Sequence, residues 1–65
     1  MTTLKDYFIY DRANNSLLKF EANSDIIFYA SKDEAIEDLY GNEEVIQFNE
    51  LPQDKKNEIL KQLNK

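Results

Sequence analysis

The sequence predicts a small single α+β domain with the element order β-β-β-α-β-α. We expect a three-stranded antiparallel meander plus a fourth strand, together a mixed sheet that packs with two helices. Three observations support this fold: aromatic and branched runs fill the first half of the chain, the apolar period changes from two to about 3.6 at Ser31, and a second helical stripe follows Pro52. With 65 residues, 42% of them hydrophobic, residues 1–65 are expected to build one core and one domain.

The first two strands are expected to form a β-hairpin. Two runs rich in aromatic and branched side chains flank a short segment with paired asparagines, which tolerate the left-handed backbone of tight turns. A four-residue loop at 12–15 would set Ile9 opposite Leu18 and Tyr7 opposite Phe20, whereas a two-residue turn would shift this pairing. We expect the four-residue loop, because the register decides which side chains share the buried face.

Residues 26–30 are expected to form the third strand, after a turn at 22–25. Extending the register gives the sheet two apolar faces. The expected core face consists of Tyr7, Ile9, Leu18, Phe20, Ile27 and Tyr29. The opposite face receives Phe8, Tyr10, Leu17, Ile26, Phe28 and Ala30, diluted by Arg12, Lys19 and Glu21. This second face is still too apolar for an ordinary solvent-exposed surface.

A helix is predicted over residues 32–40, bounded by local chemistry at both ends. Ser31 and Glu34 have the spacing of a capping box, and Gly41 supplies a left-handed stop. At about 100° per residue the acidic residues fall on the outer side and four apolar residues on the other. The side expected to pack on the sheet is formed by Ala35, Ile36, Leu39 and Tyr40.

A fourth strand over residues 42–49 and a last helix complete the predicted fold. A strand, a short helix and a strand joined by tight loops normally form a right-handed crossover between parallel strands, beside either the first or the third strand here. Pro52 favours the start of the last helix. Its expected apolar stripe comprises Ile59, Leu60 and Leu63, with Lys56 extending beside them.

The composition argues against several classes of function. The chain has no cysteine and no histidine, so it offers neither disulfides nor thiolate or imidazole ligands. The single glycine gives no phosphate-binding loop, and the carboxylates are expected on an exposed helix. We therefore predict a protein that is not an enzyme, with no catalytic, cofactor-binding or metal-binding residues.

The charge and the apolar distribution indicate where the protein acts. A net charge of -5 repels nucleic acid and anionic lipid, so direct nucleic-acid binding is not expected. No apolar run approaches the ~20 residues of a membrane span, and no apolar signal core follows Met1. These features favour a cytoplasmic protein, and the abundance of Lys, Asn, Ile, Tyr and Phe is typical of AT-rich bacterial or phage genomes.

An acidic segment is the leading candidate for a functional surface. No Lys or Arg occurs between Asp33 and Asp54. Like charges four positions apart mildly destabilise a helix, so a helix selected only for stability would mix its signs. The hypothesised partner-binding residues are Asp33, Glu34, Glu37, Asp38, Glu43 and Glu44. They would meet a basic protein patch or imitate the phosphates of a nucleic acid; alternatively, they only keep the domain soluble.

The second apolar face of the sheet offers another candidate interface, formed by Phe8, Tyr10, Leu17 and Phe28. It could bind a second copy of the chain, or the last helix could cover it while the acidic helix covers the other face. The predicted function is a non-catalytic protein-binding module of regulator or inhibitor type, engaging a basic partner through the acidic helix. The alternative is a homo-oligomeric structural or accessory protein that uses the aromatic sheet face.

Overall fold

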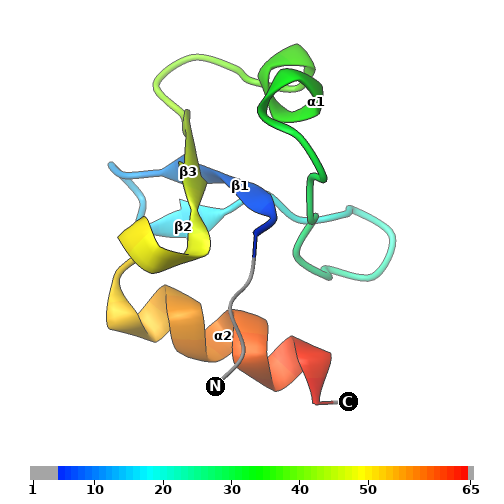
Figure 1. The fold of residues 1–65 in the computed structure, drawn as a ribbon, viewed down its shortest axis with the longest axis vertical. Helices are drawn as coiled ribbons and strands as arrows, with labels where there is room; N and C mark the ends of the chain where they lie inside the picture. Colours follow the sequence, from blue (N-terminus) through cyan, green and yellow to red (C-terminus); the bar gives the residue numbers. More distant parts are fainter. Residues whose placement is uncertain (1–4, 65) are drawn as a thin grey trace.

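The computed structural model describes residues 5–64 as a small α+β domain in which a sheet lies between two helices. Its elements are β1 (Tyr7–Asp11), β2 (Ser16–Leu17), α1 (Lys32–Glu37), β3 (Glu44–Gln47), a 3-10 helix η1 (Phe48–Glu50) and α2 (Gln53–Leu63). The three strands have the order β2-β1-β3 and both pairings are antiparallel. Helix α1 lies on one side of the sheet and α2 on the other (Figure 1).

The β1–β2 hairpin has the predicted register. Tyr10 lies opposite Leu17, and the Leu18 amide donates to the Ile9 carbonyl (2.9 Å), so the four-residue loop is confirmed. Asp11 organises this loop, because its Oδ1 accepts from the backbone amide of Ala13 (3.1 Å).

The turn chemistry at Asp11 also extends to Asn14, whose side-chain amide donates to Asp11 Oδ2 (2.7 Å). This bond, together with the backbone amides of Asn14 and Ala13, holds the pKa of the Asp11 carboxyl below its ordinary value. Asn15 then adopts a left-handed φ of 50°, as expected for an asparagine in a tight turn. Asp11 and Asn14 therefore fix the loop locally, while Asn15 ties it to α2 by donating to Asp54 Oδ2 (2.9 Å).

The prediction of a third strand at 26–30 is wrong. With the rest of residues 5–64 this segment makes only two isolated bridges, Tyr7 to Tyr29 and Lys19 to Ile26. Tyr29 takes the place opposite Tyr7 that was expected for Phe20, and Phe20 is 52% exposed. The reason is a tight turn after β2: the Phe20 amide donates to the Asp25 carbonyl (2.8 Å), which carries the chain away from β1.

The strand predicted at 42–49 exists, with the shorter range of β3. Residues 5–64 form only three strands in total, and because both pairings are antiparallel the sheet is not mixed. β3 pairs with β1, with Phe8 opposite Ile46 and Ile9 opposite Val45. The parallel crossover was expected because a strand at 26–30, a short helix and β3 would follow one another, with β3 beside either the first or the third strand; the position beside the first strand is the one observed. Because that strand is missing, the chain instead passes over α1 to the free edge of β1, and β3 runs antiparallel to it.

Helix α1 begins as predicted and ends earlier. The Ser31 hydroxyl accepts from the Glu34 amide (3.3 Å), which confirms Ser31 as the N-cap. The helix ends at Glu37 rather than at residue 40, because the amide of Asp38 donates to the Ala35 carbonyl (3.1 Å), three residues back, and tightens the last turn. Gly41, with φ +55°, belongs to the following turn instead of the helix terminus.

Two buried clusters hold the layers together, one on each face of the sheet. The cluster under α1 consists of Ile9, Tyr29 and Ala35, with Tyr7, Leu18, Ile27, Leu39 and Val45 packed against it. The cluster over α2 consists of Phe8, Tyr10, Leu17, Ile26, Phe48, Leu51 and Ile59, with Phe28 and Ile46 packed against it. Phe8 and Phe28 meet edge to face with ring centroids 4.9 Å apart. Both faces of the sheet are therefore core.

Helix α2 packs on the sheet with a different side from the one that the spacing of its leucines predicts. Ile59 is fully buried, but Leu60 and Leu63 are exposed. The half-buried positions beside Ile59 are polar, Lys55 and Gln62 among them, because these side chains bond to neighbouring groups instead of packing. The predicted apolar stripe therefore does not form, and Lys56 instead places its Nζ 5.9 Å from the centroid of the Phe48 ring. Neither this helix nor α1 is long and apolar enough to cross a membrane.

Candidate functional site

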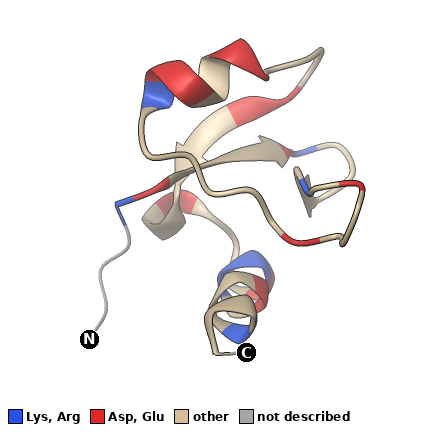
Figure 2. Ribbon diagram, turned by 90° about the vertical axis from the view of Figure 1, so that its right-hand side faces the viewer, with Lys and Arg blue, Asp and Glu red and all other residues tan. Residues whose placement is uncertain are grey.

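Helix α1 presents most of its surface to solvent. Within the helix only Ala35 is buried, where it packs against Ile9 and Tyr29. Asp33, Glu34 and Glu37 are exposed, and their carboxylates make no hydrogen bond or ion pair with any of residues 5–64. Figure 2 shows this largely acidic helix at the outer end of the molecule. We call these three side chains the α1 carboxylates.

The other three predicted partner-binding residues have partners inside the chain. Asp38 Oδ2 accepts from the Tyr29 hydroxyl (2.8 Å), and Glu43 Oε1 accepts from the Tyr40 amide (3.1 Å). Glu44 Oε1 accepts from the Arg12 guanidinium at 2.6 Å. Each therefore holds a turn or a strand end in place. The structure separates the predicted acidic set into three free carboxylates and three engaged ones.

Two apolar residues of the acidic segment are exposed, which the sequence analysis did not predict. Ile36 is 49% exposed and Tyr40 is 81% exposed, although both were expected to pack on the sheet. A helix of six residues places only one turn against the sheet, and Tyr40 lies beyond its end. No sequence pattern reveals this, because the apolar spacing is the same for a longer, fully packed helix. The acidic segment thus carries two large apolar side chains among its carboxylates.

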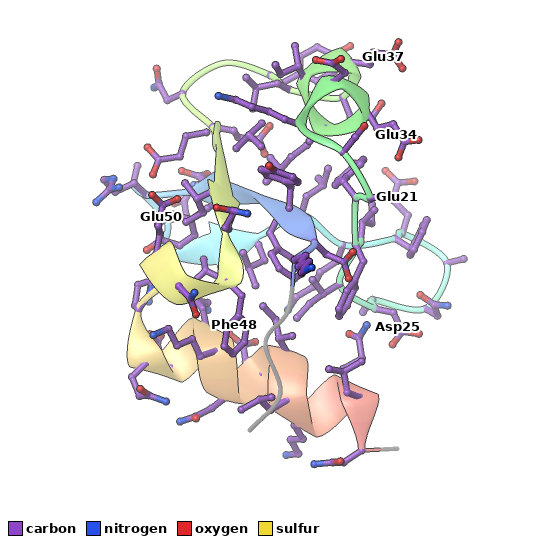
Figure 3. All side chains as sticks on the ribbon, viewed as in Figure 1. Glu21, Asp25, Glu34, Glu37, Phe48 and Glu50 are labelled. Carbon is purple, nitrogen blue, oxygen red and sulfur yellow. The ribbon has the colours of Figure 1, made fainter. Side chains whose placement is uncertain are left out.

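A further carboxylate comes from a distant part of the sequence. In Figure 3 the side chains of Glu37, Glu34 and Glu21 lie along one side of the molecule. Glu21 is exposed and follows Phe20 in the turn after β2. Glu21 was expected at the end of the second strand, as a charge that dilutes the second apolar face, and its place on this side was not predicted. Only the tertiary fold brings this turn to the side of α1.

The aromatic sheet face is not an open surface. Phe8, Tyr10 and Leu17 are at most 5% exposed, and Phe28 is half-buried against them. Helix α2 covers this face through Ile59. Of the two arrangements expected from the sequence, the structure therefore has the one in which the helices cover opposite faces of the sheet. A second copy could reach these four residues only after α2 had moved away.

Among the described titratable groups, the buried Tyr29 has the most strongly shifted pKa. Burial, followed by the hydrogen bond to Asp38 and the charge of that carboxylate, raises the pKa of Tyr29 to about 12. A phenol with this pKa stays protonated at neutral pH and is a poor general base. Its role here is to tie Asp38, just after α1, to the core.

A shallow cleft of about 480 Å³ lies between α2 and the turn that follows β2. Its rim carries both signs of charge, from Lys19, Asp25, Glu58 and Lys61, and Lys19 Nζ lies 3.7 Å from Glu58 Oε1. Over the described range no group of three or more acidic side chains has the arrangement of a metal site. The cleft is therefore lined by mixed charges and by no such metal-binding group of the described residues.

The chain matches no family model, and neither a curated protein nor a solved structure shows significant similarity to it.

Proposed function

We propose that this protein is a non-catalytic protein-binding module that engages a basic partner through α1 and the turn after it. The observation that carries the proposal is the exposure of Ile36 and Tyr40 among the α1 carboxylates. Carboxylates alone would equally suit a solubilising surface. Large apolar side chains left in solvent beside them are the composition of a protein interface.

The two kinds of side chain have different tasks in this proposal. Tyrosine is enriched among the residues that dominate binding energies, and Tyr40 offers nearly its whole ring. The α1 carboxylates would steer a basic partner, speed its association and set its orientation. Binding should consequently weaken as salt concentration rises, without disappearing, because the apolar contact is not screened.

The engaged carboxylates contribute indirectly. Asp38, Glu43 and Glu44 are tied to Tyr29, Tyr40 and Arg12, so their main role is to fix the backbone that presents the surface. Changing them would damage the fold as well as the interface. A clean test therefore leaves these three residues unchanged.

The test begins with capture of partners from the cell of origin by the wild type and by the variant Asp33→Asn, Glu34→Gln, Glu37→Gln. A matched control, Gln53→Lys, Asn57→Lys, Asn64→Lys, shifts the net charge by the same amount at two exposed positions of α2 and at its exposed C-cap. We expect the first variant to lose the partner and the control to retain it. Equal capture by all three proteins would contradict the proposal.

A second measurement separates charge from apolar contact. With the captured partner, Tyr40→Ala is expected to raise the dissociation constant about tenfold or more, since residues of this kind each contribute more than about 1 kcal/mol. Tyr40→Phe keeps the ring and should bind nearly as well as the wild type. A Tyr40→Ala variant with unchanged affinity would show that the Tyr40 ring takes no part in binding, and the role given to this exposed side chain would be refuted.

A further inference from the structure

The hydrogen bonds of β1 determine which way the groups of β3 point. The amide of Tyr7 donates to the Tyr29 carbonyl (2.8 Å) and the amide of Tyr29 donates to the Tyr7 carbonyl (3.0 Å). The Ile9 carbonyl accepts from Leu18 (2.9 Å). The backbone polar groups of Tyr7 and Ile9 therefore point away from β3. The β3 residues opposite them form the non-hydrogen-bonded pairs of the antiparallel ladder.

The outer edge of β3 follows from this alternation. Gln47 lies opposite Tyr7 and Val45 lies opposite Ile9, so both direct their amide and carbonyl groups away from β1. By the same alternation we place Glu43, which immediately precedes β3, next in this row. β3 lies at an end of the sheet order β2-β1-β3, so no other strand within residues 5–64 covers this row, and it forms a sheet edge. Such an edge is a template for another strand.

Both ends of this row are already bonded within the chain. The Glu43 amide donates to the Tyr40 carbonyl (3.1 Å), and the Gln47 amide donates to Glu50 Oε2 (3.2 Å). Figure 3 shows the Glu50 side chain beside β3. Val45 alone keeps an outward amide that no group within residues 5–64 accepts.

We propose that Glu50 guards the β3 edge against pairing with a second copy of the same edge. Two β3 strands can meet antiparallel around Val45, with Val45 opposite Val45 of the partner and Gln47 opposite Glu43 of the partner. This register sets no like charges directly opposite each other. In the native chain only the Val45 pair can exchange hydrogen bonds. Without Glu50, the freed Gln47 amide adds a bond to the Glu43 carbonyl of the partner at each end.

The central test is Glu50→Ala, with the molar mass measured by light scattering over a range of protein concentrations. We expect the wild type to stay at the mass of one chain and Glu50→Ala to rise towards twice that mass. Glu50→Gln retains an acceptor oxygen and is expected to behave as the wild type does. Glu50 is exposed, so these substitutions should leave the fold intact, which circular dichroism verifies. Glu50→Lys, also without an acceptor, replaces Glu50→Ala if that variant is unfolded.

A second substitution identifies the edge itself. The Val45 amide is not used in the β1–β3 ladder, so proline at this position removes the outward donor while β3 stays paired. Glu50→Ala combined with Val45→Pro should therefore return to the mass of one chain.

Hydrogen exchange at Gln47 completes the test, because the amide should exchange faster in Glu50→Ala than in Glu50→Gln. A Glu50→Ala protein that exchanges faster at Gln47 and yet stays monomeric would show that Glu50 only caps η1, and the proposal would be overturned. Dimerisation that persists in the Val45→Pro double variant would overturn it too, because a different surface would be responsible. An unchanged exchange rate at Gln47 would mean that Glu50 does not hold this amide, which is equally incompatible with the proposal.

Discussion

The side-chain amide of Gln62 pairs with the backbone of Ile26 in the way that a neighbouring strand would. The Ile26 amide donates to Gln62 Oε1 (2.8 Å), and Gln62 Nε2 donates to the Ile26 carbonyl (3.1 Å). The flanking bonds from Phe20 to Asp25 and from Ile27 to Leu18 leave the polar groups of Ile26 pointing outward, towards α2. One side chain thus satisfies both groups and docks α2 on the turn after β2.

Replacing Gln62 should destabilise the fold more than its half-buried position suggests. Gln62→Leu keeps much of the volume but leaves the amide and the carbonyl of the buried Ile26 without partners, at a cost of about 1 to 3 kcal/mol. Urea denaturation measures the difference. Gln53→Leu, at an exposed position of the same helix, is the control and should stay within about 0.5 kcal/mol of the wild type. Equal effects of the two substitutions would show that the pairing with Ile26 contributes nothing.

The raised pKa of Tyr29, about 12, gives the fold a weakness at alkaline pH. Because the folded state favours the neutral phenol, this contribution to stability is complete below the unfolded pKa of about 10 and is lost as pH rises towards 12. Between these values the wild type should lose stability more steeply than Tyr29→Phe, which does not titrate. Urea midpoints at successive pH values test this. Tyr40→Phe, at an exposed position, is the control, and coincident profiles for wild type and Tyr29→Phe would refute the prediction.

The N-cap of α1 should make a measurable contribution to the free energy of unfolding. Ser31→Ala removes the oxygen that accepts from the Glu34 amide, and a lost cap typically costs about 1 kcal/mol. Ser31→Asp keeps an acceptor and should remain near the wild-type stability. Chemical denaturation monitored by circular dichroism is suitable. If Ser31→Ala and Ser31→Asp were equally stable, the hydroxyl would not be acting as a cap.

The α1 carboxylates should lower the stability of the helix that carries them. Glu37 lies four positions after Asp33, in a last turn that holds no basic residue. Glu37→Lys replaces a like-charge pair by an opposite one and should raise stability by about 0.2 to 0.5 kcal/mol at low salt, an effect that added salt removes. The same change is expected to weaken partner capture. A loss of stability on this substitution would mean that Glu37 has a structural partner.

Local chemistry could be predicted from the sequence where neighbouring residues decide it. The paired asparagines indicated the hairpin loop, and the apolar pattern of the two runs gave the position of Ile9 opposite Leu18. Ser31 indicated where α1 begins, although the return bond of a capping box, from the Glu34 carboxylate to the Ser31 amide, does not form. Both features depend mainly on residues that are close in the sequence.

Features set by distant contacts could not be predicted. Residues 26–30 have strand composition, but the turn between Phe20 and Asp25 directs them to touch the sheet at only two points. On α2 the apolar spacing selected Leu60 and Leu63, whereas Gln62 faces inward because it serves the backbone of Ile26. Apolar periodicity cannot reveal a polar side chain that faces inward to satisfy the backbone groups of another segment.

The acidic surface was predicted only in part, for the same reason. The charge run identified Asp33, Glu34 and Glu37, which are exposed and free within the described chain. It could not separate them from Asp38, whose carboxylate is bound by Tyr29 from the core. Nor could it reveal the exposure of Tyr40, which depends on α1 ending at Glu37.

The position of β1 between two partners also bears on the order of events during synthesis. β1 and β2 leave the ribosome close together and can pair early, since only the short loop separates them. The second edge of β1 then stays unpaired until residues 44–47 are synthesised, because Ile46 and Val45 are the residues that pair with Phe8 and Ile9. A nascent chain that stalls before this point exposes an aromatic strand to its neighbours, which is the stage at which chaperone contact would protect it most.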